Sequence, residues 1–212
     1  MKQQLRVAPT KSALLQLQRQ SRFLEQGHDM LERKRELLTR VVQERLAQYR
    51  ALRRQAAEAV TEAYRWLAIA HIRMGSHVLG QHAVVMPPAL EINILPRSHV
   101  GVEYPAVEAQ PRPLNAVALM WTDPSFDQAR ASLAEMAVLL ARLGEAETAL
   151  WRLLIEQRKT QKRVNALKYN IIPMYRAKIR DIRSALEEEE RNALFQMKLL
   201  REAELGESGA SG

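Results

Sequence analysis

A leucine repeat with a period of seven dominates the first third of the sequence. Every seventh residue from position 17 reads Leu17, Leu24, Leu31, Leu38, Arg45, Leu52, Ala59 and Trp66. No proline falls between Pro9 and Pro87, and the first glycine after Gly27 is Gly75. A seven-residue repeat held over so many turns keeps one stripe of a helix against a partner by left-handed supercoiling. The repeat therefore predicts one long helix that pairs with another helix.

The positions three residues before each member of this row form the other half of the helix seam, and half of them are polar. They read Leu14, Ser21, His28, Arg35, Val42, Tyr49, Ala56 and Ala63. Only 5% of the 212 residues are aromatic, so the large rings that usually fill a globular core are scarce. Because such a seam is too weak for the interior of a compact domain, we expect an exposed rod.

The first helix is expected to occupy residues 10–75, after a flexible lead of residues 1–9. Thr10 is a suitable N-cap, and Gly75 suits the position just past a helix end. Seven of the nine prolines lie in the following insert, residues 76–124, which excludes helix from most of it.

Within the insert, apolar and polar residues alternate on both sides of a turn expected at residues 96–98. The alternating apolar residues are Leu90, Ile92 and Ile94, then Val100, Val102 and Tyr104. This period of two predicts a short β-hairpin, with a further extended piece at residues 116–121.

A second long helix is expected over residues 125–205, with Pro173 bending it and a disordered Gly/Ser-rich tail at 206–212. Two long amphipathic helices joined by an insert most economically form an antiparallel pair. Facing residue numbers should then add to about 200–205, with both chain ends at one tip. The predicted fold is all-α, a long antiparallel two-helix coiled coil with a small β-hairpin insert in the middle of the chain. The predicted seam contains Leu17, Leu24, Leu31, Leu38, Leu52, Trp66, Leu140, Leu154, Val164, Ile171, Tyr175 and Ile182.

Composition restricts the functional classes. The chain has no cysteine, which excludes disulfides and thiolate metal sites, and no run of about 20 apolar residues that could span a membrane. Phosphate-cradling glycine motifs and the nucleophile-elbow motif are absent. His71, His77 and His82 are spaced by six and five residues, which does not stack them on one helix face, so neither a metal site nor another cofactor site is expected.

The net charge of +8 implies an anionic partner, which could be nucleic acid, a lipid surface or the acidic lining of another protein. Basic residues gather on both helices, at stretches that the antiparallel register brings opposite each other. The predicted partner-contact residues are Arg33, Lys34, Arg35, Arg158, Lys159, Lys162, Arg163, Asn165, Lys168 and Tyr169. A solvated face is the plain alternative. Nucleic-acid binding is a further one, although few aromatic residues interleave with the basic ones for stacking.

Two separated motifs resemble the D subunit of the V-type/A-type rotary ATPases. The first is Pro9–Leu15, followed by Gly27–Leu31 and Lys34–Leu38. The second is the run Lys162–Tyr169 with Ile171-Ile172-Pro173, which is similar to the family block R-V-N-A-L-E followed by I-P. Lys168 stands where the family usually has Glu, which makes this stretch more basic.

The resemblance implies a non-catalytic central rotor shaft without a cofactor. Such a shaft would transmit torque between ATP turnover in the A/B hexamer and H⁺ or Na⁺ movement through the membrane ring. The implied partners are the A/B hexamer, the F subunit and the connector to the proteolipid ring, with one copy per complex and no nucleic acid. The implied location is peripheral, on the cytoplasmic face of a membrane. The alternative is a free-standing basic coiled-coil adaptor that binds nucleic acid or an anionic membrane.

Overall fold

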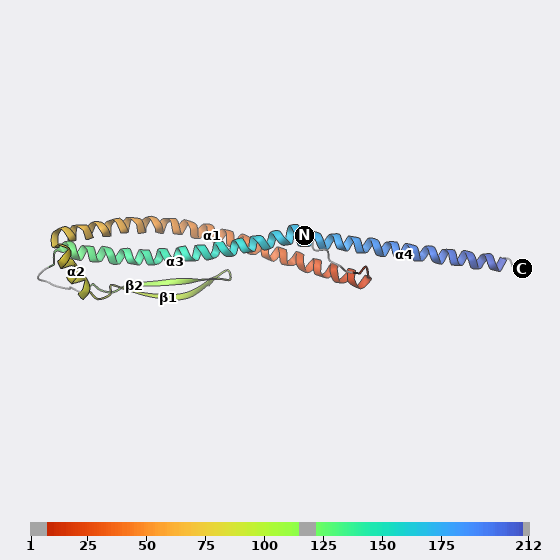
Figure 1. Ribbon diagram of the computed structural model, residues 1–212, viewed down its shortest axis with the longest axis horizontal. Helices are drawn as coiled ribbons and strands as arrows, with labels where there is room; N and C mark the ends of the chain where they lie inside the picture. Colours follow the sequence, from red (N-terminus) through yellow and green to blue (C-terminus); the bar gives the residue numbers. More distant parts are fainter. Residues whose placement is uncertain (1–7, 115–121, 210–212) are drawn as a thin grey trace. The chain divides into compact units, whose positions relative to one another are not determined.

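The computed structural model describes residues 8–114 and 122–209 (Figure 1). Long helices dominate it, and a two-stranded antiparallel hairpin lies in the middle of the chain, which confirms the predicted fold class. Within the described ranges, no helix is both long and apolar enough to cross a bilayer. The elements in chain order are α1 (Lys11–Met74), α2 (Ser76–Val85), β1 (Leu90–His99), β2 (Val102–Pro111), α3 (Pro124–Ala166), the π-helix η1 (Leu167–Ile171) and α4 (Ile172–Gly209).

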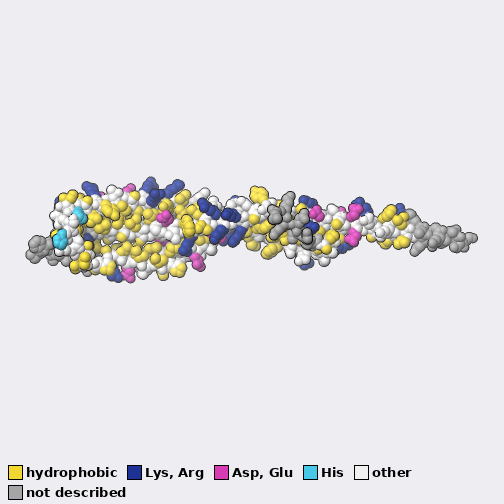
Figure 2. All heavy atoms as spheres, in the orientation of Figure 1, with side chains coloured by type: hydrophobic (Ala, Val, Ile, Leu, Met, Phe, Trp, Pro, Cys, Tyr) yellow, Lys and Arg dark blue, Asp and Glu magenta, His cyan; other side chains and the backbone are white. Residues whose placement is uncertain are grey.

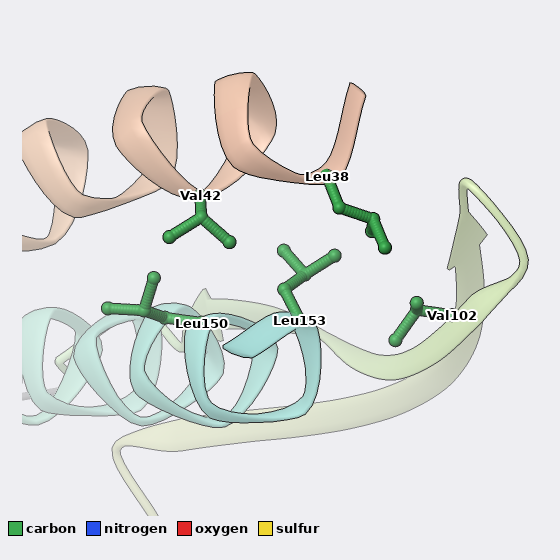
Figure 3. Packing of buried hydrophobic residues seen from close by; sticks show 5 residues of the cluster. All are labelled: Leu38, Val42, Val102, Leu150 and Leu153. Atoms are coloured by element: carbon green, nitrogen blue, oxygen red, sulfur yellow. The ribbon is translucent and has the colours of Figure 1, made fainter. Parts of the chain in front are cut away.

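The chain divides into two compact units, and the division falls inside both long helices. One unit is Lys34–Lys159, and the other combines Met1–Arg33 with Thr160–Gly212. In the Lys34–Lys159 unit, α1 and α3 run antiparallel, and the hairpin lies along them (Figure 1). Side chains from all three meet in one apolar cluster (Figure 3), made of Leu38, Val42, Val102, Leu150 and Leu153.

Beyond this cluster, small residues form the α1 side of the contact. Ala56, Ala63 and Ala70 are at most 2% exposed, whereas Leu52 and Trp66 are half-buried. In this part of α1, the row that contains Ala56 and Ala63 is therefore more deeply buried than the row that contains Leu52 and Trp66. Alanines in a seam allow two helices to approach closely, since the interaxial distance depends on the side chains at the contact.

One predicted seam residue is wrong. Leu140 is 42% exposed, while Ala149 is 2% exposed. Nine residues make two and a half helical turns, so Leu140 lies on the side of α3 opposite Ala149. Leu154 is half-buried against the apolar cluster, as a seam residue should be.

The hairpin is longer than predicted, and its turn lies elsewhere. Residues 96–98 belong to β1, and the chain reverses at Val100 and Gly101, with φ of 53° and 72°. Positive φ at both central residues is what a tight two-residue hairpin turn requires. Along the ladder, hydrogen-bonded and non-hydrogen-bonded residue pairs alternate, beginning with the hydrogen-bonded pair His99↔Val102. The pair Pro96↔Pro105 is therefore a non-hydrogen-bonded one, and the missing proline amide hydrogens cost the ladder no hydrogen bond.

In the other unit, the start of α1 pairs with α4. Arg176 Nη2 lies 2.7 Å from Glu25 Oε1, and Lys11 Nζ lies 2.7 Å from Glu190 Oε1. Both pairs fit the antiparallel register predicted from sequence. The α4 helix continues past Glu190 to Gly209, so residues 206–209, which were expected to be disordered, are helical. The predicted seam residues are buried (Leu17, Val164 and Ile182) or half-buried (Leu24, Leu31, Ile171 and Tyr175).

Two further local features were not predicted from the sequence. Residues 76–85 form the helix α2 inside the insert, ending just before the Pro87-Pro88 pair. Pro173 follows a π-helical turn in which the Ile172 amide donates to the Leu167 carbonyl. Proline cannot donate to the carbonyl four residues earlier, and the wider turn accommodates that interruption. The extended piece expected at 116–121 lies outside the described residues.

Candidate partner-binding surfaces

Polar contacts between α1 and α3 position the first group of basic residues. Lys34 Nζ lies 3.2 Å from Glu156 Oε1, and Gln157 Nε2 donates to Thr39 Oγ1 at 2.9 Å. These contacts set residues 34–39 of α1 opposite residues 156–157 of α3. The predicted register places the partners of residues 34–39 about one to four helical turns further along the chain. The structure thus places Lys34 and Arg35 beside the α3 turn that carries the exposed Arg158 and Lys159.

The remaining predicted contact residues lie in the other unit. Arg33 on α1 and Lys162 and Arg163 on α3 are all exposed. Asn165 is exposed as well, and its Oδ1 accepts a hydrogen bond from Gln161 Nε2 at 2.8 Å.

Lys168 and Tyr169 both belong to the π-helical turn of this unit. The Lys168 ammonium lies 5.6 Å from the centre of the Tyr169 ring, a cation–π distance, and Tyr169 is 66% exposed. The turn therefore presents a cation and an aromatic ring together to solvent. Such a pair can contact carboxylates and apolar side chains of a partner.

The hairpin is held to the helices by contacts that the sequence analysis missed. Arg45 donates to the Tyr104 hydroxyl at 3.3 Å and lies over its ring, and Arg152 donates to the Glu103 carbonyl at 2.9 Å. The Val107 amide donates to Glu145 Oε2 at 3.1 Å. Every one of these contacts is made by β2. No sequence pattern marks them, because each depends on how the hairpin lies against α1 and α3.

The outer strand β1 is exposed along its length. Ile92, Ile94 and Leu95 are 46%, 65% and 52% exposed. Figure 2 shows further hydrophobic side chains across the face that carries α3 and the hairpin. Apolar side chains in such number on a surface are typical of a chain that meets other proteins.

The start of α3 is fixed by an aspartate cap. The Ser125 amide donates to Asp123 Oδ2 at 3.0 Å, the Ser125 hydroxyl bonds the same oxygen, and Arg73 Nη1 lies 3.2 Å from it. Together the two Ser125 hydrogen bonds, and then the Arg73 charge, hold the pKa of Asp123 below its ordinary value of 3.8. The Asp-Pro-Ser sequence, with proline at the first helical position, is a signal that predicts this cap.

The histidines singled out in the sequence have other contacts. His71 Nε2 lies 3.0 Å from the Ser76 hydroxyl, and the His82 ring packs 5.6 Å from the Phe126 ring. Across residues 8–114 and 122–209, no three histidine or carboxylate side chains gather closely enough to hold a metal ion.

Comparison with known proteins identifies the family. The family model for the D subunit of ATP synthase matches residues 13–202, which include both long helices and the hairpin. The chain belongs to the family of ATP synthase D subunits. The D subunit of a V-type ATP synthase from Thermotoga neapolitana is 34% identical over 197 residues, covering 92% of this chain and 97% of that protein. The D subunits of the A-type ATP synthases from Thermococcus sibiricus and Pyrococcus furiosus are 34% and 33% identical over 201 residues, covering 93% of this chain and 94% of each relative.

Family membership assigns the long helices a setting in a multi-subunit complex. The relatives are named as subunits of an ATP synthase, and the family match runs through the basic stretches of α1 and α3 as well as the hairpin. The exposed basic and apolar side chains are therefore surfaces of a D-subunit family member.

Proposed function

We propose that the chain is the non-catalytic central rotor shaft of a V/A-type ATP synthase. It transmits torque between ATP hydrolysis or synthesis in the A/B hexamer and H⁺ or Na⁺ translocation through the membrane ring. One copy serves each complex, peripheral to the membrane on its cytoplasmic face. The observation that carries the proposal is a 64-residue helix α1, about 96 Å long at 1.5 Å per residue, in a chain of this family.

The chemistry of the surface supports a shaft. A rod that turns inside a bore needs a solvated outside, because deep apolar sockets would hold it at one angle. The exposed residues Arg158, Lys159, Lys162 and Arg163 on α3 fit that requirement. Coupling of rotation to ATP turnover also requires an asymmetric rod. Each rotation angle of the rod then favours a different nucleotide state at the otherwise equivalent sites of the A/B hexamer.

Three partner contacts follow from the proposal. The basic groups, with Asn165 and Tyr169, face acidic loops in the bore of the A/B hexamer. The F subunit docks on the Lys34–Lys159 unit near the hairpin. The connector to the proteolipid ring meets the end of that unit near Trp66 and Leu79.

Reconstitution tests this proposal. The purified chain is mixed with the A/B hexamer and the F subunit of its organism, and gel filtration at moderate salt is combined with an ATPase assay. We expect co-elution at one copy per hexamer and altered ATP turnover. A gold rod attached to the hairpin should then rotate when ATP is added.

Two results would contradict the proposed function as a rotor shaft. One is failure to co-elute with the hexamer. The other is salt-sensitive retention of nucleic acid or anionic vesicles in place of the hexamer, since phosphate contacts weaken steeply with salt. The second result would establish the adaptor alternative.

A further inference from the structure

An open groove lies along α1 in the Lys34–Lys159 unit. Its volume is about 750 Å³. All of its lining residues come from one stripe of α1: Leu46, Tyr49, Arg50, Arg53, Arg54 and Ala57. The spacing of three and four residues keeps these side chains on one face of the helix over about 17 Å.

The groove combines an apolar floor with a basic rim. Leu46 and Tyr49 are half-buried, because they also pack against the apolar cluster beneath. Arg50, Arg53 and Arg54 are exposed, and among the described residues none of the three pairs with a carboxylate. Figure 2 shows Lys and Arg side chains gathered along α1 in this unit.

The local sequence gives the groove positive charge alone. From Arg45 to Ala57 there are four arginines and no acidic residue. The next stretch of α1, residues 58–65, mixes both signs, as in the contact between Arg65 and Glu62. A solvated face would be expected to mix both signs, whereas a rim of one sign favours an occupant of the opposite sign.

We propose that this groove is the docking site for an acidic amphipathic helix of a partner polypeptide. Such a helix places its apolar stripe on Leu46 and Tyr49, and its flanking carboxylates meet the guanidinium groups of Arg50 and Arg54. Guanidinium–carboxylate pairs are bidentate, and amphipathic helices bind grooves through anchors at this spacing. The length of the groove fits about three helical turns. Nucleic acid fits less well, because one tyrosine offers little stacking and the floor is apolar. The inference rests on the proposed role in a multi-subunit complex.

A charge-swap experiment tests the groove directly. The probes are two fluorescein-labelled 18-residue helical peptides with the same leucine stripe, one flanked by glutamates and one by lysines. The full chain is compared with the R50E/R54E variant and with R19E/R22E, a matched control on exposed arginines of the same helix. Circular dichroism checks that all three are equally helical.

The expected result is an inverted preference. The unaltered chain and R19E/R22E should bind the glutamate peptide at least tenfold more tightly than the lysine peptide, and R50E/R54E should reverse that order. The inference is overturned if the unaltered chain shows no preference, or if R50E/R54E keeps it. It is also overturned if a 20-base-pair DNA duplex binds more tightly than the glutamate peptide and depends on the same two arginines.

Cross-linking in the assembled complex identifies the natural occupant. A photoactivatable residue at position 57, exposed in the groove, should link to one partner segment with an apolar stripe and an excess of acidic residues. A complex that assembles with the hexamer but cross-links only to segments without net negative charge overturns the inference and leaves the shaft intact. If the chain fails to assemble with the hexamer, that result counts against the proposed shaft function. The peptide-binding experiment still decides whether the groove prefers an acidic helix.

Discussion

At the scale of single residues, Leu38 joins three elements. It is 0% exposed and packs with Val42 of α1, Val102 of β2 and Leu153 of α3. Leu38→Ala should lower the free energy of unfolding by about 2–5 kcal/mol, because it removes buried methyl groups and leaves a cavity among fixed neighbours.

The neighbouring residue provides a matched control for that substitution. Leu37 is 50% exposed on the same helix, so Leu37→Ala should cost far less. Urea unfolding followed by circular dichroism measures both. Equal losses in the two variants would show that the cluster does not hold the hairpin and helices together.

For the basic residues, the sequence predicts which side chains are exposed but does not predict which residues they pair with. Their identity and their exposure follow from composition and helical spacing. The pairing of Lys34 with Glu156 does not follow, because a half-polar seam leaves the helix register free by a turn or more. Likewise, Arg45 occupies a seam position in the repeat, and its contact with Tyr104 exists only once the hairpin has docked.

At the scale of elements, the cap of α3 predicts a pH dependence. The pKa of Asp123 is lowered in the folded chain, chiefly by the Ser125 hydrogen bonds and then by Arg73. The folded state therefore favours the ionised carboxylate, and its contribution is fully present above the ordinary pKa of 3.8. That contribution is lost as the pH falls through the lowered value.

Thermal unfolding between about pH 2.5 and 7 measures the effect of the cap. The Tm difference between the unaltered chain and Asp123→Ala should be constant above about pH 5 and should shrink at lower pH. Ser125→Ala, which removes the hydroxyl hydrogen bond, should flatten the same dependence. A Tm difference that stays unchanged down to the lowest pH would contradict the assignment.

The hairpin shows why the existence of an element is easier to predict than its boundaries. Alternating apolar residues predict the two strands correctly. The predicted turn is misplaced because Pro96 and Ser98 resemble turn residues, whereas β1 tolerates Pro96 at a non-hydrogen-bonded pair. The actual turn puts Val100, a β-branched residue, at φ of 53°, a conformation that local sequence preference disfavours. The docked strands impose that conformation.

At the scale of the whole molecule, the chain retains a large exposed surface. It exposes 15833 Å², against about 10,000 Å² expected for a compact protein of 24.2 kDa. The fully extended chain would expose roughly 35,000 Å², so folding here buries about three-quarters of the area that a compact chain of this mass would bury. The heptad repeat and the scarcity of aromatic residues predict this shortage of interior.

The small buried area sets the response to denaturant, because the m-value scales with the surface exposed on unfolding. The total urea m-value, summed over all transitions, should be about a quarter below that of a compact monomer of 212 residues measured in parallel. Two protein concentrations control for self-association, which would bury additional surface. An m-value equal to that of the compact control would mean that the free chain covers its surface by itself. An m-value that is low for the free chain and higher in the assembled complex is what a protein stabilised by its partners should give.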